Sequence, residues 1–466
     1  MGSAATKVVG AAVVAAVALS AGSFWVGSWV EQVFRDSAEA ATQYGIKVTV
    51  VDYQRGVFGA VARTEVTFPG AGGDEPVTIA FNHRIEHGPV PAFTSAARIH
   101  SEPQPSGDPT EQFSELLGSD AFVGQPVTID STFDWAGGHR HRIVLPRKFE
   151  ATFGSDKEGG SKVSGEEIDG EFEVFPGQAR QKAKFIIGGF SLSRGISDSI
   201  RVDRGTLDCE FRMDGGQLLG WIAKVNVERV ATEGNVKNTI NGIALDSEAN
   251  LSDGTLSVTA KLAVAGIVRE KETRVVINDI RTSFLFGHLG VDALKGIFSD
   301  VLQAEDEQAA LKLFQERWTM LLQYHPVFAV QDVSAHWQEG ELSGGFRIEY
   351  SGAGISGLDD IALADVAADW QLNLPRALAA RFVGEQMYED GIEAEEFDDG
   401  ESGAEEPAAA KPTKEQIDKH ITALIEDGVL LEKNGTLSLD AIFRKGELTL
   451  NGKVAPVESL LILSPF

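Results

Sequence analysis

The hydrophobic and polar positions of the chain follow three successive patterns. Val8 to Val30 contains no charged residue, and a helix of this length, rising about 1.5 Å per residue, would cross a hydrocarbon core of roughly 30 Å. From about residue 47 to 285, apolar and polar positions alternate in short runs between glycines, which is typical of strands. Helical spacing appears only after residue 286. The patterns predict a membrane anchor followed by a mainly β (α+β) ectodomain.

Two alternatives compete for the apolar stretch. A cleaved signal peptide would end at a small-residue site, for which Ala18-Leu19-Ser20 would serve. The apolar run continues past that site, however, and Trp25 and Trp29 near its far end resemble an interfacial belt. An uncleaved transmembrane signal-anchor is therefore favoured. Because Lys7 precedes the span and acidic residues follow it, the N-terminus is expected in the cytoplasm and the bulk of the chain on the other side.

The first strands are expected to form an antiparallel meander. Lys47–Tyr53, Phe58–Phe68 and Val77–Ile85 are rich in β-branched residues, and the glycine- and proline-rich segment Pro69–Pro76 separates the second run from the third. Further alternating runs, punctuated by glycine pairs, continue to about residue 285 without a strict repeat. This series predicts an extended, largely antiparallel β-sheet or sandwich.

Helices with an apolar stripe are predicted late in the chain. The segments are 291–303, 307–324 and 376–387, the second with Leu311, Phe314, Trp318, Leu321 and Leu322 at helical spacing and the third following Pro375. A further helix to about Glu426 is predicted to be capped by Thr413, with Gln416 completing a capping box. Alternation from Leu437 to Leu450 around Arg444-Lys445-Gly446 predicts a closing hairpin.

The segment Glu389–Glu406 carries acidic residues and no basic one. Such a run repels itself and is typical of a disordered linker. A calcium site is the alternative, but the spacing lacks the alternating ligands and fixed glycine of an EF-hand. The predicted organisation is therefore an anchor at 1–36, a β-rich part at 37–285, a helix-containing part at 286–388, an acidic linker at 389–412, and a helix plus hairpin at 413–466.

Composition narrows the possible partners. The net charge is −28 and the pI is near 4.7, so most of the surface would repel nucleic acid. Cys209 is the single cysteine, which excludes an intramolecular disulfide, and its acidic neighbours in Asp208-Cys209-Glu210 would raise its pKa. The sequence has no phosphate-binding loop, dinucleotide fingerprint, nucleophile elbow or zinc signature. No catalytic residue, cofactor or metal is predicted.

Two short motifs resemble a known family. Tyr53-Gln54-Arg55-Gly56-Val57-Phe58, soon after the apolar stretch, and the strand ending in His87-Gly88-Pro89 are similar to motifs of the YdgA family of bacterial inner-membrane proteins. Gly446–Gly452 resembles the closing strand of that family. The resemblance implies an anchored periplasmic β-rich protein of unknown function, and it carries over no catalytic residues.

The motifs also suggest one small cluster. If the hairpin loop is centred near Gly72, His87 lies opposite Val57 and Glu86 opposite Phe58, so that Tyr53, Arg55, Glu86 and His87 would meet. Glu86 could then orient a titrating His87 while Arg55 binds an anion.

The structural alternative for these motifs is favoured. In it, Gly56 and Gly88 permit tight turns, Pro89 ends the strand, and Tyr53 and Arg55 stabilise the strand end by hydrogen bonds. His139 and His141 would share a strand face; a metal site there is the alternative to an exposed polar face, which is favoured.

Three functions remain candidates. The first is a non-enzymatic membrane-anchored envelope protein that binds lipid or hydrophobic clients on an extended sheet. The second is a self-associating or partner-binding envelope scaffold whose sheet edges dock another protein. A hydrolytic enzyme is third. The membrane anchor is assigned to Val8, Trp25, Trp29 and Val30, and the expected location is the bacterial inner membrane with the bulk in the periplasm.

Overall fold

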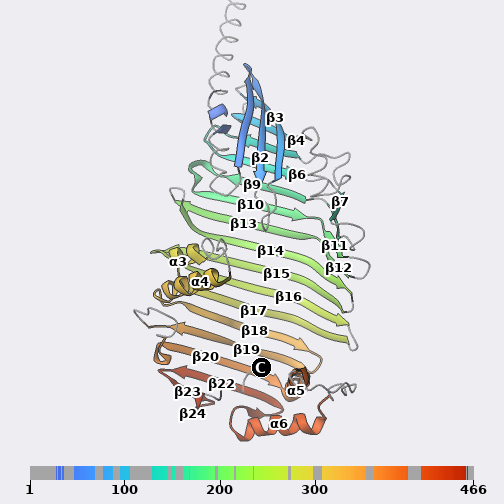
Figure 1. Ribbon diagram of the computed structural model, residues 1–466, viewed down its shortest axis with the longest axis vertical. Helices are drawn as coiled ribbons and strands as arrows, with labels where there is room; N and C mark the ends of the chain where they lie inside the picture. The colour runs from blue at the N-terminus through green and yellow to red at the C-terminus, as the bar shows by residue number, and fades with distance from the viewer. Residues whose placement is uncertain are drawn as a thin grey trace, which may run out of the picture. The chain divides into compact units, whose positions relative to one another are not determined.

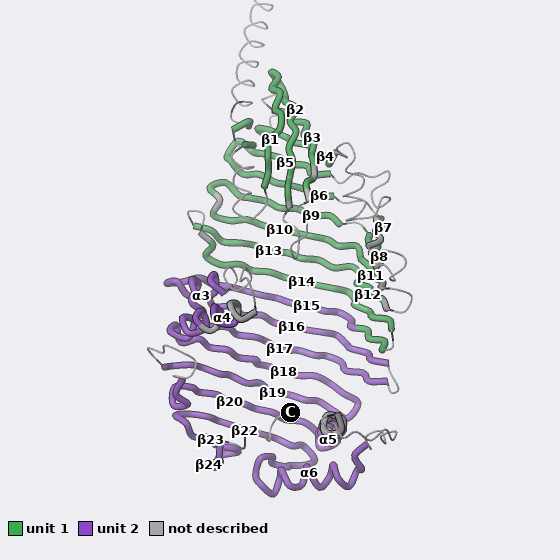
Figure 2. Tube along the Cα trace, viewed as in Figure 1, with its two compact units in different colours: residues 1–239 green, residues 240–466 purple. Residues whose placement is uncertain are grey.

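The fold is mainly β, built of antiparallel strands with a few helices (Figure 1). The computed structural model of the chain describes residues 28, 30–32, 34–35, 47–68, 77–87, 95–104, 128–144, 148–153, 161–166, 168–194, 198–214, 217–234, 236–270, 274–297, 307–352, 361–396, 411–457 and 459. Two compact units divide it, residues 1–239 and 240–466 (Figure 2). This border falls inside the β-rich segment that the sequence suggested for 37–285.

Unit 1 begins with a few helical residues, and strands follow. Residues 28, 30–32 and 34–35 are helical. The strands are β1 (Lys47–Arg55), β2 (Gly59–Phe68), β3 (Val77–His87), β4 (Ala97–Gln104), β5 (Thr128–Phe133), β6 (His139–Val144), β7 (Lys148–Phe153), β8 (Ser161–Glu166), β9 (Ile168–Val174), β10 (Arg180–Ile187), β11 (Phe190–Arg194), β12 (Asp198–Val202), β13 (Gly205–Asp214) and β14 (Gln217–Glu233), with a 3₁₀ turn at Pro176–Gln178.

Hydrogen bonding in unit 1 follows two ladders that meet on β14. The main ladder runs β1–β2–β3–β4–β5–β6–β9–β10–β13–β14, antiparallel throughout. A side ladder runs β7–β8–β11–β12 and joins the C-terminal part of β14. The predicted meander of the first three strands is confirmed, as is the antiparallel β class.

Unit 2 contains the remaining strands and the longer helices. The strands are β15 (Lys237–Ser252), which begins at the border, β16 (Thr255–Glu270), β17 (Arg274–Gly290), β18 (Val327–Trp337), β19 (Gly340–Tyr350), β20 (Val366–Pro375), β21 (Leu431–Lys433), β22 (Thr436–Arg444), β23 (Glu447–Leu450) and β24 (Lys453–Ala455). The helices are α3 (Val291–Gly296), α4 (Glu307–Leu322), α5 (Arg376–Glu396) and α6 (Lys414–Glu426), with a 3₁₀ turn at Leu363–Asp365. The antiparallel order is β16–β17–β18–β19–β20–β22–β23–β24, with β21 also on β22.

The local predictions at the C-terminus are confirmed. Thr413 caps α6, and its hydroxyl accepts from the Gln416 backbone N–H while the Gln416 side chain accepts from the Thr413 N–H. The hairpin β22–β23 turns at Lys445-Gly446, where both residues have positive φ, 54° and 81°. A two-residue hairpin loop needs this left-handed pair to match the twist of its strands.

Helix α5 corrects the predicted extent of the acidic linker. It continues to Glu396, so that residues 389–396 are helical and not part of a disordered segment. Glutamate and alanine have high helix propensity, and a helix already started at Arg376 needs no new nucleus to continue through them. Residues 397–410 of the predicted linker lie outside the described residues.

The predicted membrane span lies almost entirely outside the described residues, which include only Ser28 and Val30 of it. None of the helices in the described part of the chain has both the length and the hydropathy needed to cross a membrane.

Candidate functional site

The register of unit 1 places one row of side chains across its main ladder. Cross-strand partners in an antiparallel sheet project from the same face. Starting from the motif arginine, the row reads Arg55, Ala60, Ile85, Ile99, Ser131, His141, Phe172, Ala183, Cys209, Ala223. The face that carries this row is called the apolar face below.

Over its later strands, the apolar face is not covered by any residue that the structure describes. On β9, β10, β13 and β14 it presents large hydrophobic side chains at alternate positions: Ile168, Phe172, Val174, Phe185, Ile187, Leu207, Phe211, Trp221, Val225 and Val227. Only Val174 among them is buried; the others are partly exposed. The buried clusters found among the described residues do not include these strands. The uncovered part of the apolar face is therefore one layer of sheet with a partly wetted hydrophobic surface.

The opposite face of the same strands is adapted to water. It carries charges of alternating sign across the ladder. Arg140 lies 3.0 Å from both Glu171 and Glu173, and Lys182 lies 3.3 Å from Glu210. Each of these charged pairs is at least partly exposed. In the segments that carry these pairs, charged and hydrophobic residues alternate in the sequence, and this alternation determines which face of the sheet is hydrophobic.

The N-terminal helical residues cover the apolar face over the first strands. Val30 is buried and packs with a cluster of small and branched side chains: Ala60, Ala62, Ile85, Ala97 and Ile99. Phe34 lies beside Tyr53, with ring centroids 5.9 Å apart, and edge-on to His83 at 5.0 Å. This cluster is the hydrophobic core of unit 1 among the described residues.

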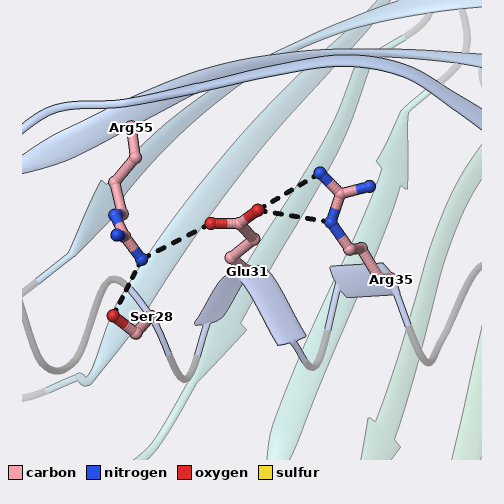
Figure 3. Close-up of polar contacts among 4 residues, drawn as sticks. All are labelled: Ser28, Glu31, Arg35 and Arg55. Atoms are coloured by element: carbon pink, nitrogen blue, oxygen red, sulfur yellow. Dashed lines mark hydrogen bonds and ion pairs between the residues drawn. The ribbon is translucent and has the colours of Figure 1, made fainter.

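Polar contacts fasten this cover to β1 (Figure 3). The Arg55 guanidinium donates to the Ser28 hydroxyl at 2.8 Å and lies 3.5 Å from the Glu31 carboxylate. Arg35 pairs with the same carboxylate at 3.2 Å, and its guanidinium lies 5.8 Å from the centre of the Tyr53 ring. Burial, and next the Glu31 charge, raise the pKa of Tyr53 to about 12. The motif residues Tyr53 and Arg55 therefore hold the helical residues against the sheet.

Two histidines on the apolar face are neutral at pH 7. His83 contacts the Thr64 hydroxyl at 2.8 Å and the Ser101 hydroxyl at 2.7 Å, and burial lowers its pKa to about 4. His141 contacts the Ser131 hydroxyl at 2.7 Å, and its pKa is lowered to about 4 by burial and then by His139.

The prediction of an exposed polar strand face at His139 and His141 is wrong. Both rings lie on the apolar face, where His139 stacks on Phe133 at 5.5 Å and His141 on Phe172 at 6.3 Å. The arginines between and beside them take the opposite face, so the polar face carries Arg140 and Arg142. Within the described ranges, no group of three His, Cys, Asp or Glu side chains is placed to hold a metal ion.

The register of β2 and β3 corrects the predicted acid–base cluster. Glu86 pairs with Gly59, and the His87 N–H donates to the Phe58 carbonyl at 3.2 Å, one residue away from the predicted pairing. The pairs of β2 and β3, such as Phe68 with Val77, are shifted by one residue from a pairing centred on Gly72, and such a shift exchanges the faces. Glu86 therefore projects from the face opposite Tyr53 and Arg55, and it lies 3.9 Å from Arg84. His87 is fully buried.

The Gly56–Gly59 turn is tight, as the structural alternative for the motif requires. The Gly56 N–H donates to the Gly59 carbonyl at 2.7 Å. A Cβ on Gly59 would lie 2.6 Å from the Ile85 carbonyl oxygen, so only glycine fits beside β3. Between the glycines, Val57 and Phe58 are exposed. Five predicted site residues lie outside the described residues: Gly88, Pro89, Val8, Trp25 and Trp29.

Sequence reasoning missed Ser28, Glu31, Phe34 and Arg35. These residues directly follow the apolar stretch, and the change to an amphipathic segment was not recognised. A signal was present, because Glu31 and Arg35 stand four residues apart, which is the spacing of a helical ion pair. It also missed the location of Cys209 on the apolar face. Burial, and secondarily Asp208, raise the pKa of that thiol, so the acidic neighbour has the predicted effect but is not the main cause.

Unit 2 has its own apolar face, built in the same way. One cross-strand row reads Val258, Phe286, Phe328, Ile348, Ala368, Phe443, Leu448. At its β20–β23 end the row is covered by α5 and α6, whose Leu378, Val383, Ile421 and Leu424 join the buried cluster. At β17–β19 it is partly exposed and forms an aromatic ladder, in which the Phe286 and Phe328 ring centroids are 4.9 Å apart.

Comparison with protein families gives a match over most of the chain. The sequence pattern of a bacterial protein family of unknown function (DUF945) matches residues 5–458, nearly the whole chain. A search of curated proteins finds no match.

Proposed function

The chain belongs to this bacterial family of unknown function, and we propose that it is a membrane-anchored envelope protein that binds lipid acyl chains, or comparably hydrophobic clients, on the uncovered apolar face of unit 1. No catalytic step is part of the proposal. The N-terminus would be cytoplasmic, the stretch from Val8 to Val30 would anchor the chain in the inner membrane, and the strands would lie in the periplasm.

One observation carries the proposal: the uncovered apolar face has the composition of a core and lacks a second layer among the described residues. A sheet normally buries such a face against helices or another sheet. On β9, β10, β13 and β14, large hydrophobic side chains stay partly exposed while the opposite face carries paired charges. A contiguous exposed apolar surface of this kind marks a binding site or an interface.

Lipid is favoured over a protein client because the face is almost free of directional polar groups. Its polar members are His139, His141, Ser131, Gln181 and Cys209. His141 and Ser131 contact each other, and both histidines have lowered pKa values, so no charge lies among these hydrophobic side chains of β9, β10, β13 and β14 up to Val227 at pH 7. Acyl chains need an extended apolar strip and no fixed hydrogen bonds.

Native mass spectrometry of the full chain, extracted from membranes in mild detergent, tests the proposal with two matched variants of β14. Val225→Glu places a carboxylate on the apolar face, and Ile222→Glu places one on the opposite face, where Ile222 is already exposed. Lipid bound at fixed stoichiometry should be lost in Val225→Glu and retained in Ile222→Glu, with both variants folded by circular dichroism. Equal lipid in both variants, or none in the wild type, would contradict the proposal.

The alternative function, a partner-binding scaffold, is favoured by α4. Leu321 and Leu322 are buried, but Leu311, Phe314 and Trp318, the rest of the predicted stripe, are exposed. The Phe314 and Trp318 rings stack at 5.7 Å. An exposed stripe of this spacing is typical of a helix that docks a partner. In the same mass spectra, a lipid-free dimer that Phe314→Ser dissociates would support the scaffold.

A further inference from the structure

The turn that carries the family motif exposes two large hydrophobic side chains. Val57 and Phe58, at the centre of the Gly56–Gly59 turn, are 45% and 48% exposed. The turn itself is fixed by the Gly56–Gly59 hydrogen bond and by the bond from His87 to the Phe58 carbonyl. Turns usually carry polar residues at their centre, because their side chains project into water. Two apolar side chains that project outward from a fixed turn therefore indicate that something apolar contacts the turn.

The contacts of Arg55 show where this turn lies relative to the start of the described chain. Arg55 directly precedes the turn and donates to the Ser28 hydroxyl at 2.8 Å, whereas Tyr53, two residues farther from the turn, contacts Phe34 and Arg35. The helical residues thus run away from the turn as their numbers increase. The uncharged stretch that ends at Val30 therefore meets the described structure at the turn end of β1.

A second turn at the same strand end exposes a tryptophan. Phe58, His87, Ala97 and Phe133 are consecutive backbone partners across β2 to β5, so the β1–β2 and β5–β6 turns lie at one end of the meander. Trp135, in the turn from Asp134 to Gly138, is 52% exposed. The Asp134 carboxylate accepts from the Ala136 and Gly138 N–H groups at 2.8 Å, which fixes that turn too.

We propose that Val57, Phe58 and Trp135 form a lipid-contact edge that rests in the interfacial region of the phospholipid bilayer. Tryptophan prefers this depth, where the ring is buried and the backbone remains near water, and phenylalanine is common on the apolar side of segments that lie there. The occupant is a bilayer and not a soluble partner, because Ser28, the last part of the apolar stretch to be followed toward the N-terminus, lies at the same strand end. The inference rests on the proposed anchoring, but not on ligand binding by the apolar face.

Such an edge has a consequence for lipid access. The row of Arg55 runs from the turn end of β1 across the covered strands to the uncovered apolar face. Two fixed turns on the bilayer would stop the sheet from pivoting about a single helix. The strand ends of unit 1 would then be held at the membrane surface, where acyl chains are available.

Depth-dependent quenching tests the edge in the full chain. The single cysteine is removed by Cys209→Ser, and Phe58→Cys is labelled with the polarity-sensitive fluorophore NBD in phosphatidylcholine nanodiscs with or without doxyl-labelled phosphatidylcholine. The edge predicts blue-shifted emission and a loss of intensity with the doxyl lipid. The control position, Ile222→Cys on the charged face of β14 in the same unit, is 42% exposed and should show neither change.

A third label separates the edge from the anchor. Ala12→Cys lies inside the apolar stretch. Quenching at residue 12 but not at residue 58 would overturn the edge and leave the anchor in place, whereas quenching at neither residue would overturn both. Blue-shifted emission at residue 58 without quenching would mean that protein covers the turn, which also overturns the edge.

Discussion

Two phenylalanines of unit 2 stand on the same cross-strand row but in different surroundings. Phe443, on β22, is 4% exposed beneath α5 and α6, and Phe286, on β17, is 37% exposed. Both project from the apolar face and have apolar cross-strand neighbours, Ala368 and Leu448 for the first and Val258 and Phe328 for the second. The two strands have the same pattern of apolar residues on this face. They differ in whether helices cover that face.

Unit 1 repeats this contrast. Ile85, on the row of Arg55, is buried beneath Val30, and Phe172 on the same row is partly exposed. In each unit, then, helices cover one end of a hydrophobic face and leave the rest available. Where a face is covered, its side chains stabilise the fold; where it is uncovered, the same chemistry is available to a ligand.

The contrast is tested most strongly by removing both rings of the unit 2 row. Phe443→Ala should cost about 3–5 kcal/mol of unfolding free energy, because it leaves a cavity in a packed core. Phe286→Ala should cost only about 1–2 kcal/mol, because the ring is already partly in water. Urea denaturation of the full chain, followed by circular dichroism and tryptophan fluorescence, measures both. Equal losses would show that the β17–β19 face is packed like the covered end.

Acid should destabilise unit 1 through its two neutral histidines, one in the covered and one in the uncovered region. His83 and His141 have folded pKa values of about 4, below the ordinary 6.5. The unfolded state therefore binds protons first, so stability is complete above pH 6.5 and falls as the pH drops to 4. Each histidine should account for up to about 3 kcal/mol of this loss.

Glutamine variants measure the two contributions. His83→Gln and His141→Gln should each flatten the fall in melting temperature between pH 6.5 and 4. The control is His100→Gln: this exposed ring bonds Asp130 and Glu102, which raises its pKa and gives the opposite pH dependence. An unchanged acid slope in His141→Gln would show that water reaches this part of the apolar face freely.

Weakening helix α6, which covers one end of the unit 2 face, should lower the free energy of unfolding by less than the histidine protonation does. Thr413→Ala removes the side-chain half of the α6 capping box and should cost about 1 kcal/mol, whereas Thr413→Ser keeps the hydroxyl and should cost little. Hydrogen exchange on α6 and β22 gives the readout: faster exchange of both in Thr413→Ala would show that α6 protects the face. Faster exchange of α6 alone would mean that the cover is not what protects β22.

The smallest effect is expected at the Arg55–Glu31 contact. Both side chains are partly exposed and 3.5 Å apart, so a double-mutant cycle of Arg55→Met and Glu31→Gln should give a coupling energy below about 1 kcal/mol. The Arg55–Glu31 contact then orients the helical residues on the sheet but adds little to their stability, which comes from the packing of Val30 in its hydrophobic cluster. A coupling well above this range would assign the stability of the cover to the ion pair.

Local signals allowed much of the fold to be predicted. Alternation located β1, β2 and β3, and the Thr413–Gln416 box and the Lys445-Gly446 turn were found because their chemistry is complete within a few residues. The pairing of β2 with β3 could not be fixed in the same way. It depends on the position between Phe68 and Val77 at which the chain reverses, and an error of one residue in that position moves Glu86 to the opposite face.

The site depended on information that alternation does not contain. A strand with one hydrophobic face reads the same whether a helix covers it or not, so Phe443 and Phe286 look alike in the sequence. Residue type alone assigned His139 and His141 to a polar face. Arg140 and Arg142 alternate with them, and a charged guanidinium costs more to bury than a neutral imidazole, so the arginines take the solvent face. Coverage is a property of segments distant in sequence, such as Val30 over Ile85.

The central claim is that the uncovered apolar face of unit 1 binds acyl chains, and Cys209 allows a direct measurement. It is the single cysteine and lies on the row of Phe172. The full chain would be labelled there with benzophenone-maleimide, at mildly alkaline pH because the thiol pKa is raised, and irradiated in membranes. The claim predicts a phospholipid adduct at Cys209 that Val225→Glu abolishes. Adducts only with protein or solvent, while a benzophenone at Ala12→Cys in the Cys209→Ser background captures lipid, would contradict it.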